Sequence, residues 1–191
     1  MQHVFVQAGC YVQPCGWLRR RIDEYPDSLA YIIEANRFQW PVISKAIVDK
    51  GYEGRIELIS KACWDVDDQE ITFYTGAGRK ETTVGASALS DKWRRAPTKT
   101  VISKVQTMDF SKFVAEHNEA GRCVHVIMDI EGAEFRILSK MIADNTLRII
   151  GRLDVEWHAH KMRSDKKEFY KKWKHAILEY WNTRPNPVPK L

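Results

Sequence analysis

Residues 124–138 read Val-His-Val-Ile-Met-Asp-Ile-Glu-Gly-Ala-Glu-Phe-Arg-Ile-Leu, and this stretch decides the fold of the chain. Its first five residues form an apolar run, interrupted only by His125, that is typical of a buried strand. Beyond Gly132, the residues Phe135, Ile137 and Leu138 predict a helix whose apolar side packs back on the sheet. A strand that leads at once into a helix is typical of an open α/β sheet.

Three carboxylates surround the glycine at this strand-to-helix junction, namely Asp129, Glu131 and Glu134. Function in open α/β sheets sits at such strand ends. An ordinary turn would need only one polar capping residue, so three acids are more than folding requires. The junction therefore predicts a functional site.

The length and composition of the chain favour one globular domain. A chain of 191 residues can bury one substantial core, and its 44% hydrophobic and 29% charged residues are ordinary proportions. No apolar stretch approaches the length of a membrane span, and the first residues lack the basic start and apolar run of a signal peptide. We expect a cytoplasmic protein with a core over residues 1–160, on which residues 161–191 pack as an amphipathic helix and extended tail.

The net charge indicates which partners the chain favours, and the cysteine spacing indicates the state of its thiols. A net charge of +5 favours anionic partners, and the main basic run lies over residues 161–174. The cysteines at positions 10, 15, 63 and 123 are irregularly spaced, with no Cys-x-x-Cys pair and no His-x-x-x-His that would complete a zinc site. The pattern favours reduced, partly buried thiols over disulfides or a structural metal.

Strands and helices alternate in the first third of the chain. The expected elements are a strand over 3–6, a loop over 7–16, a helix over 17–24, a strand over 29–33 that ends at Glu34, a helix over 40–50 and a strand over 55–62. This β-α-β-α-β order implies parallel strands joined by crossover helices.

The rest of the chain is less regular at first. The expected elements are an exposed strand over 70–74, a mobile loop over 76–90, a strand over 99–106, a helix capped by Asp109 or Ser111 that runs to Glu119, a strand from Cys123, a helix to Ile142, a strand over 147–156, a helix from about 164 to 181 and a tail over 182–189. In the last helix, an apolar stripe of Phe169, Trp173, Ile177 and Trp181 favours a sheet-covering helix with a solvated lysine face over a nucleic-acid element.

Residues 128–134, Met-Asp-Ile-Glu-Gly-Ala-Glu, resemble the signature of the FkbM family of S-adenosylmethionine-dependent methyltransferases. That signature reads Lys-Ile-Asp-Val-Glu-Gly-Ala-Glu followed by an apolar pair, and Met128 stands where the family has lysine. The resemblance extends more loosely from Val4 to about His158. It implies a Rossmann-like, doubly wound, mainly parallel sheet flanked by helices, with residues 1–160 as the S-adenosylmethionine-binding core.

Glu34 closes the second strand, where a carboxylate in a nucleotide-binding α/β sheet can accept both hydroxyls of a ribose. The alternative is an acid that caps a helix at a strand end. The similar position of FkbM-like methyltransferases binds the ribose of S-adenosylmethionine, so the resemblance favours ribose binding. Asn36, two residues further on, is expected beside the same cofactor.

Gly9 lies just past the first strand, where the absence of a side chain lets the backbone approach a ligand. The alternative is a plain turn. The family has an acid, a glycine and soon a second glycine here, whereas this chain has Gln7 in place of the acid and Gly16 displaced behind Pro14. The resemblance places Gln7 near the amino-acid end of the cofactor, but without a charge-assisted bond.

The residues after the third strand are Ala62, Cys63 and Trp64, where the related fold places the adenine. Trp64 offers an aromatic face and Asp65 an acceptor for an exocyclic amine, although Trp64 would equally serve to cover a core edge. Ser87 matches a serine of the family loop that borders the active site.

Residues 153–158 resemble the apolar-x-Glu-x-His ending of the family. Glu156 and His158 share one strand face, and the neighbouring strand ends at Asp129. Asp129, Glu131, Glu156 and His158 should therefore converge. Asp129 and Glu156 can hold a divalent cation of the Mg or Mn type, or the set can work without metal, with Glu131 or His158 as general base. His160 is expected at the surface.

The resemblance implies an O-methyltransferase that acts on a hydroxyl of a sugar or glycan, free or nucleotide-linked. In this interpretation Glu131 removes the hydroxyl proton. His158 orients the reacting groups or serves as the alternative base, and Asp129 contacts the cofactor, the acceptor or a metal. Two rivals belong to other classes. A metal-dependent hydrolase would use the same acidic cluster but would have no need of Glu34 or the adenine-side loop, and a non-catalytic domain of a larger glycan-modifying protein is suggested by the altered first loop. We expect no nucleic acid and no membrane span, with neighbouring domains of a longer polypeptide as further partners.

Overall fold

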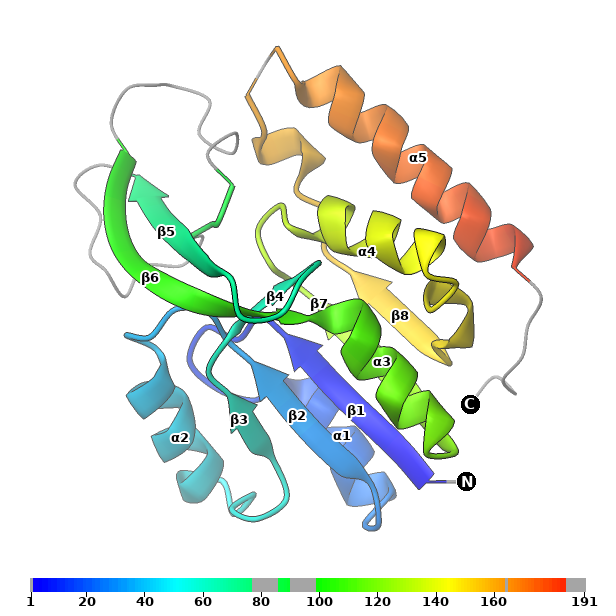
Figure 1. Cartoon of the computed structure of the whole chain (residues 1–191). Helices are drawn as coiled ribbons and strands as arrows, with labels where there is room; N and C mark the ends of the chain where they lie inside the picture. Colours follow the sequence, from blue (N-terminus) through cyan, green and yellow to red (C-terminus); the bar gives the residue numbers. More distant parts are fainter. Residues whose placement is uncertain (1, 77–85, 90–98, 164, 185–191) are drawn as a thin grey trace.

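The computed structural model describes residues 2–76, 86–89, 99–163 and 165–184. Its main sheet has the strand order β3-β2-β1-β7-β8, and all neighbouring strands in it are parallel (Figure 1). The strands are β1 (Gln2–Ala8), β2 (Leu29–Ile33), β3 (Glu57–Ile59), β7 (Arg122–Met128) and β8 (Arg152–Val155). The predicted parallel α/β sheet is confirmed.

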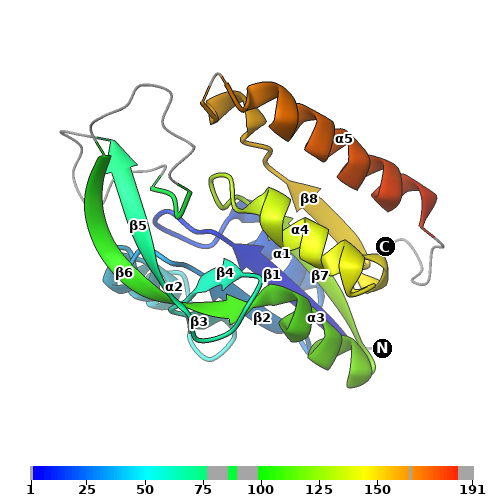
Figure 2. The same ribbon diagram turned by 45° about the horizontal axis from the view of Figure 1, so that its top comes forward.

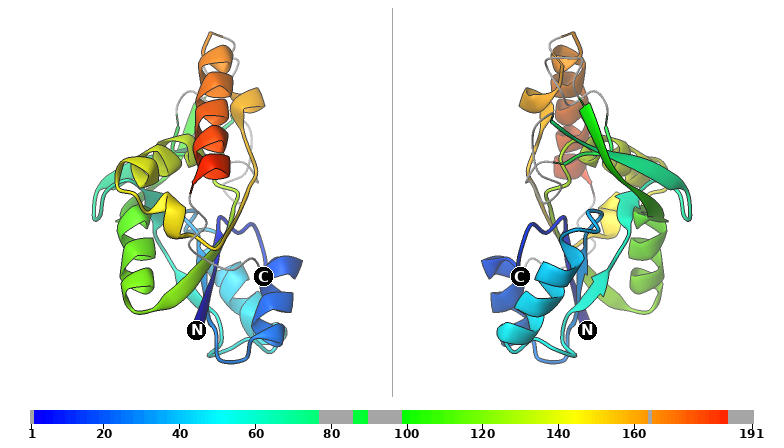
Figure 3. Two further views of the ribbon diagram at one scale, coloured as in Figure 1. Left: turned by 90° about the vertical axis from the view of Figure 1, so that its right-hand side faces the viewer. Right: turned by 90° about the vertical axis from the view of Figure 1, so that its left-hand side faces the viewer.

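Helices cover both faces of this sheet. They are α1 (Gly16–Glu24) and α2 (Trp40–Asp49) on one face, and α3 (Phe110–Glu119) and α4 (Glu134–Ala143) on the other (Figure 3). Alternate residues of the central strand fill the two cores, with Phe5 among α1 and α2 and its neighbours Val4 and Val6 in the larger core on the opposite face. This two-sided packing makes the domain doubly wound, as predicted.

A second, smaller sheet has the order β4-β6-β5, where β4 (Ala62–Trp64) is parallel to β6 (Lys99–Asp109) and β5 (Glu70–Gly76) is antiparallel to it. The β5–β6 hairpin extends beyond the carboxyl ends of β1 and β2 (Figures 1 and 2). Residues of the hairpin therefore contribute to the space above those strand ends.

The prediction of one continuous strand over 55–62 is wrong. Its residues divide into β3 of the main sheet and β4 of the small sheet. The carbonyl of Ile59 accepts the last hydrogen bond from Glu34, and after Ser60 and Lys61 the chain pairs instead with β6. The break depends on pairing with β6, which is distant in the sequence, so no pattern within residues 55–62 indicates it.

The predicted strand over 147–156 is also shorter than expected. Leu147–Ile149 forms a turn of 3-10 helix, and pairing with β7 begins where Gly151 donates to the carbonyl of Val124. Leu147 is buried in the core below this turn. Leu147 and Ile150 therefore fill the core before the strand begins.

The last helix is α5 (Lys167–Thr183), which begins and ends later than predicted and packs on α4 (Figure 2). Its predicted stripe is corrected at one position, because Phe169 is 60% exposed whereas Tyr170 is buried and lies 4.9 Å from the ring of Phe135. Ile177 is buried as predicted.

Parts of the predicted loop over 76–90 and most of the predicted tail over 182–189 lie outside the described residues. Within the described ranges, residues 182 and 183 continue α5, and Asp109 caps α3 by accepting from the amide of Lys112. None of the described helices combines the length and the apolar character that crossing a membrane requires.

Candidate active site

Three chain segments meet at Gly9, directly after β1. Gly9 donates to the carbonyl of Ile33 at the end of β2, and Asp129 at the end of β7 donates to the carbonyl of Ala8. A Cβ atom at Gly9 would lie 1.8 Å from the carbonyl oxygen of Asp129, and its φ of +86° is in the left-handed region. Only glycine fits this crossing, which brings the ends of β1, β2 and β7 together.

A cleft opens above these strand ends, between the loops that follow β1, β2 and β7 and the small sheet. The predicted residues that line it are Gly9, Glu34, Asn36, Ala62, Cys63, Trp64, Asp129 and Glu131. The residues that sequence reasoning did not single out include Cys10, Tyr11, Gln39, Phe73, Ala86 and Ala88. Phe73 comes from β5, so its place at the cleft follows from the hairpin and not from a local motif.

Glu34 is a buried carboxylate held by backbone N–H groups. Its Oε2 accepts from the amide of Cys10 at 2.7 Å, and its Oε1 accepts from the amide of Asn36 at 2.6 Å. Burial raises the pKa of Glu34 to about 7, although the hydrogen bonds from Asn36 and Cys10 act in the opposite direction. The carboxylate is therefore fixed in position at the cleft and poised between its two protonation states near neutral pH.

Trp64 and Asp65 form an aromatic and polar corner next to the cleft. The guanidinium of Arg136 lies over the Trp64 ring at 4.7 Å, and its Nε donates to Oδ2 of Asp65 at 2.6 Å. The other oxygen, Oδ1, is buried and has no hydrogen-bond partner among the described residues. Such an atom carries a desolvation cost unless a donor reaches it.

Gln7 and Ser87 hold loops in place. Gln7 donates through Nε2 to the carbonyl of Gly9 at 3.2 Å and accepts from the amide of Cys15 at 2.8 Å. Ser87 is fully buried, donates to the carbonyl of Glu131 at 2.8 Å and accepts from the amide of Leu89. Gln7 and Ser87, which were predicted to contact the cofactor, thus bind backbone groups of the protein and hold the surrounding loops in position.

Glu131 lies in a strained loop. Its φ is +57°, which is uncommon for a residue with a side chain, and strain of this kind gathers at functional sites. The Glu131 side chain is only 12% exposed and accepts from Nζ of Lys161 at 3.1 Å. Sequence reasoning missed Lys161 because it begins the basic run assigned to a solvated helix face.

Glu134 is the acid of the junction that does not face the cleft. It is fully buried, with Oε2 accepting from the amide of Gly132 at 2.7 Å and Oε1 accepting from the amide of His158 at 2.8 Å. Nδ1 of His158 lies 3.3 Å from the same Oε1. Glu134 therefore fixes the imidazole from behind.

His158 is fully buried and faces three further carboxylates. Its Nε2 lies 3.3 Å from Oε1 of Glu156 and 3.4 Å from carboxylate oxygens of Asp129 and Glu131, without the geometry of a regular hydrogen bond to any of them. Burial alone would lower the pKa of His158, but the hydrogen bond and charge of Glu134 and the charge of Glu131 outweigh it and raise the pKa.

The four predicted residues of the acidic cluster thus lie together in the structure. Burial and the neighbouring charge of Glu156 raise the pKa of Asp129, as expected for like charges held close. Asp129, Glu156 and His158 each offer one donor atom, and these atoms lie within 4.8 Å of one another. One imidazole nitrogen and two carboxylates suit a divalent cation such as Mn²⁺, so the residues present fit the predicted ion.

Comparison with known proteins points to one family. Residues 11–180 match the family model described as Methyltransferase FkbM domain. The fold is similar to the crystal structure of a methyltransferase FkbM from Methylobacillus flagellatus KT, with a TM-score of 0.53 and 13% identity. The alignment covers 95% of this chain and 38% of that one, so the chain spans well under half of its length. No curated protein matches the chain.

Proposed function

This chain belongs to the methyltransferase FkbM domain family, and on that premise we propose that it moves a methyl group from S-adenosylmethionine to a hydroxyl of a sugar or glycan. Membership of this family supports a methyltransferase activity and suggests S-adenosylmethionine as the methyl donor. A free or nucleotide-linked sugar is the proposed acceptor, because the sequence signature resembles that of FkbM methyltransferases.

The cleft above β1 and β2 is the observation that carries this proposal. A carboxylate has about four acceptor positions, and the backbone amides of Cys10, Asn36 and Ala35 contact that of Glu34, so acceptor capacity remains for the ribose. Trp64 presents an aromatic surface for the adenine, and the unpartnered Oδ1 of Asp65 is an acceptor for its exocyclic amine. Gly9, Cys10 and Tyr11 line the part of the cleft where the rest of the cofactor would lie.

Methyl transfer needs the acceptor oxygen, the methyl carbon and the sulfur in line, and a base for the hydroxyl proton. Glu131 is the better base of the two predicted candidates. It lines the cleft, and Nζ of Lys161 lies 3.1 Å from its Oε2. His158 has a raised pKa and four carboxylate neighbours, so it is better suited to orient the cluster than to accept a further proton.

Asp129, Glu156 and His158 are the residues that would hold a divalent cation. When bound, such an ion lowers the pKa of a coordinated sugar hydroxyl. The protein itself positions the three donors, with Glu134 fixing the imidazole and the crossing at Gly9 fixing the backbone of Asp129.

Calorimetric titration with S-adenosylhomocysteine tests the cofactor site. Glu34→Ala should weaken binding by about 1.5–3 kcal/mol, because a carboxylate paired to two hydroxyls makes charge-assisted bonds. Glu57→Ala is the matched control, since Glu57 is an exposed acid on the edge strand β3. Equal affinity of the Glu34 variant and the wild type would remove Glu34 from the site.

Transfer of labelled methyl from S-adenosylmethionine to monosaccharides and nucleotide sugars tests the acceptor. A product that survives mild alkali is a methyl ether, whereas a methylated carboxyl group is hydrolysed. We expect an alkali-stable sugar product. Label that is released as a base-labile ester would contradict a hydroxyl acceptor while leaving the methyltransferase assignment intact.

A further inference from the structure

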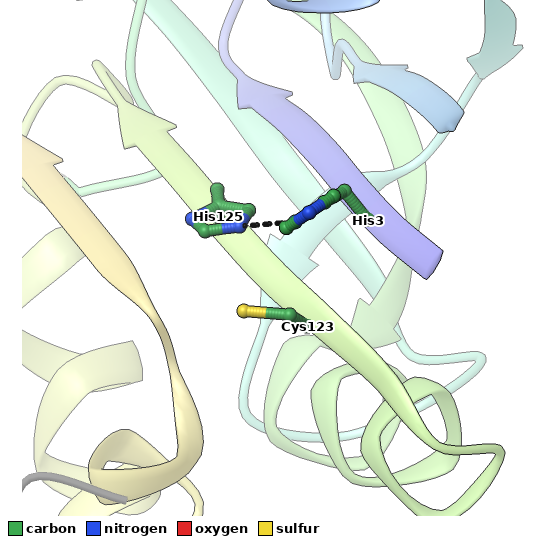
Figure 4. A group of neighbouring side chains, drawn as sticks. All are labelled: His3, Cys123 and His125. Carbon is green, nitrogen blue, oxygen red and sulfur yellow. Dashed lines mark hydrogen bonds between the residues drawn. The ribbon is translucent and has the colours of Figure 1, made fainter. Parts of the chain in front are cut away.

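A second group of metal-ligating side chains lies at the amino ends of β1 and β7, at the opposite end of these strands from the cleft. His3 on β1 is paired in register with Cys123 on β7, and His125 follows two residues later on the same strand. Residues at this spacing share one face of a sheet. Figure 4 shows the three side chains on that face, with His3 pointing toward His125 and the Cys123 thiol beside them.

The three side chains are close; Cys123 and His125 are buried and His3 is half-buried. Their donor atoms lie within 4.8 Å of one another, and Nδ1 of His3 lies 3.0 Å from Nε2 of His125. Cys123 and His125 are 2% and 1% exposed. The second ring nitrogen of His125, Nδ1, is buried and has no hydrogen-bond partner among the described residues. A buried imidazole nitrogen without a partner carries a cost that coordination of an ion by Nδ1 would remove.

Gly151 leaves space beside these donors. Its amide pairs with the carbonyl of Val124, the residue between Cys123 and His125, so it sits next to both. A Cβ atom there would lie 2.7 Å from Sγ of Cys123 and 3.2 Å from Nδ1 of His125. The backbone of Gly151 is not in the left-handed region, so its φ does not require glycine, and the space itself is what the missing side chain provides.

We propose that His3, Cys123 and His125 form a second metal site, which binds a borderline-soft divalent ion of the zinc class. Two imidazoles and a thiolate are the donors that Zn²⁺ prefers, with water in a fourth position. Binding converts the Cys123 thiol to a thiolate and releases its proton to solvent. The arginines Arg21 and Arg152 lie near His125, but each is paired with an acid, Glu24 and Asp154.

The geometry requires only a small adjustment. Zinc bonds of about 2.0–2.3 Å place tetrahedral ligands about 3.5 Å apart. The imidazole nitrogens of His3 and His125, at 3.0 Å, must therefore separate by about 0.5 Å, and a donor at the 4.8 Å limit must approach by about 1 Å. Rotation of the three side chains supplies this movement, and a side chain at position 151 would obstruct it. The bound ion would join the first residues of the central strand β1 to β7, and binding to the folded state alone would stabilise the domain.

Titration of the apoprotein with Co²⁺ tests the site, because a thiolate ligand gives a charge-transfer band that carboxylate ligands do not. We expect one equivalent of Co²⁺ to produce this band and Zn²⁺ to remove it. Cys123→Ser should abolish the band. Cys15→Ser is the matched control: it removes another thiol but keeps an N-cap on α1, where Cys15 now accepts from Leu18. Any Co²⁺ at Asp129 and Glu156 would lack the band.

Two further results decide the proposal. Zn²⁺ should raise the melting temperature of the wild type and of the Cys15 variant by more than that of the Cys123 variant, in which only the site at Asp129 and Glu156 remains. Gly151→Ala, which keeps all three donors and fills the space, should weaken Co²⁺ binding at least tenfold, with circular dichroism confirming the fold. Absence of a charge-transfer band at stoichiometric Co²⁺, or a band that persists in Cys123→Ser, would overturn the proposal.

Discussion

The two ends of the β1–β7 pair each carry a buried histidine, and their pKa values move in opposite directions. The pKa of His158, at the carboxyl end, is raised because the interactions with Glu134 and Glu131 outweigh the effect of burial. Burial lowers the pKa of His125, on β7, to about 4, and the charges of His3, Arg21 and Arg152 act in the same direction. Burial alone therefore does not set the state of a histidine, because the neighbouring charges decide the direction.

The donors at the two ends also differ in kind. The carboxyl end offers carboxylates with one imidazole, which suit Mg²⁺ or Mn²⁺, whereas the amino end offers two imidazoles and a thiol, which suit Zn²⁺. The acids at the carboxyl end lie in loops after the strands, and the donors at the amino end lie on the sheet itself. Each difference predicts an experimental response confined to one end.

Metal removal should give the largest effect and should separate the two ends. Treatment with EDTA should abolish methyl transfer, and Mn²⁺ or Mg²⁺ should restore it, because the carboxylates at Asp129 and Glu156 repel one another without a cation. Cys123→Ser should show the same loss and recovery, since Cys123 lies five residues, about 17 Å, before the end of β7. Full activity in a metal-stripped sample would leave Glu131 as a metal-free base.

Glu134→Ala should destabilise the domain by about 3–5 kcal/mol, because it leaves the buried His158 and the amide of Gly132 without their acceptor. Urea unfolding measures the change. Glu116→Ala is the matched control, an exposed acid on α3 that should shift stability by no more than about 0.5 kcal/mol. A loss below about 1 kcal/mol for Glu134→Ala would show that His158 does not depend on this acid.

Glu131→Gln should lower turnover by ~10²-fold while cofactor affinity stays nearly constant, because the amide keeps the shape but cannot take the proton. Turnover is measured by methyl transfer and affinity by titration with S-adenosylhomocysteine. Turnover within about twofold of the wild type would place the base elsewhere. His158→Asn would then identify the next candidate.

The carboxyl end was largely predictable from sequence, because its information is local. The strand over 29–33 and the junction at 124–138 carry their apolar pattern, their acids and their glycine within a few residues, and the structure confirms the elements. The pattern did not indicate which acid faces inward. Glu134 is the first residue of α4 and points into the core, whereas Asp129 and Glu131 line the cleft.

The amino end was not predictable in the same way. His3 and Cys123 are 120 residues apart in sequence and meet only because β1 and β7 pair in one register. The break between β3 and β4 has a similar origin, since it depends on pairing with β6. Pairing between distant strands is set by the packed sheet and leaves no periodic signal in either segment alone.

The pH dependence of cofactor binding is the smallest predicted effect. It tests whether burial shifts the pKa of an acid at the carboxyl end, as burial and neighbouring charges shift the pKa values of the two histidines. Burial raises the pKa of Glu34 to about 7, and an ionised carboxylate accepts hydroxyl hydrogen bonds best. Below that pH the folded apoprotein binds a proton that the cofactor must displace. Affinity for S-adenosylhomocysteine should therefore fall by up to about tenfold per pH unit below 7 and level off above it.

Glu34→Gln separates this effect from titration of Asp129 and His158, whose pKa values are also raised. The amide keeps the size of the side chain and removes its titration, so the variant should bind more weakly at pH 8 and show a flatter pH profile. Stability of the apoprotein should follow the same group with the opposite sign. Because the folded state binds the proton more tightly than the unfolded state, the contribution of Glu34 to stability declines as the pH rises from about 4.5 to 7. A wild-type affinity that is constant from pH 6 to 8 would show that the cofactor binds without needing an ionised Glu34.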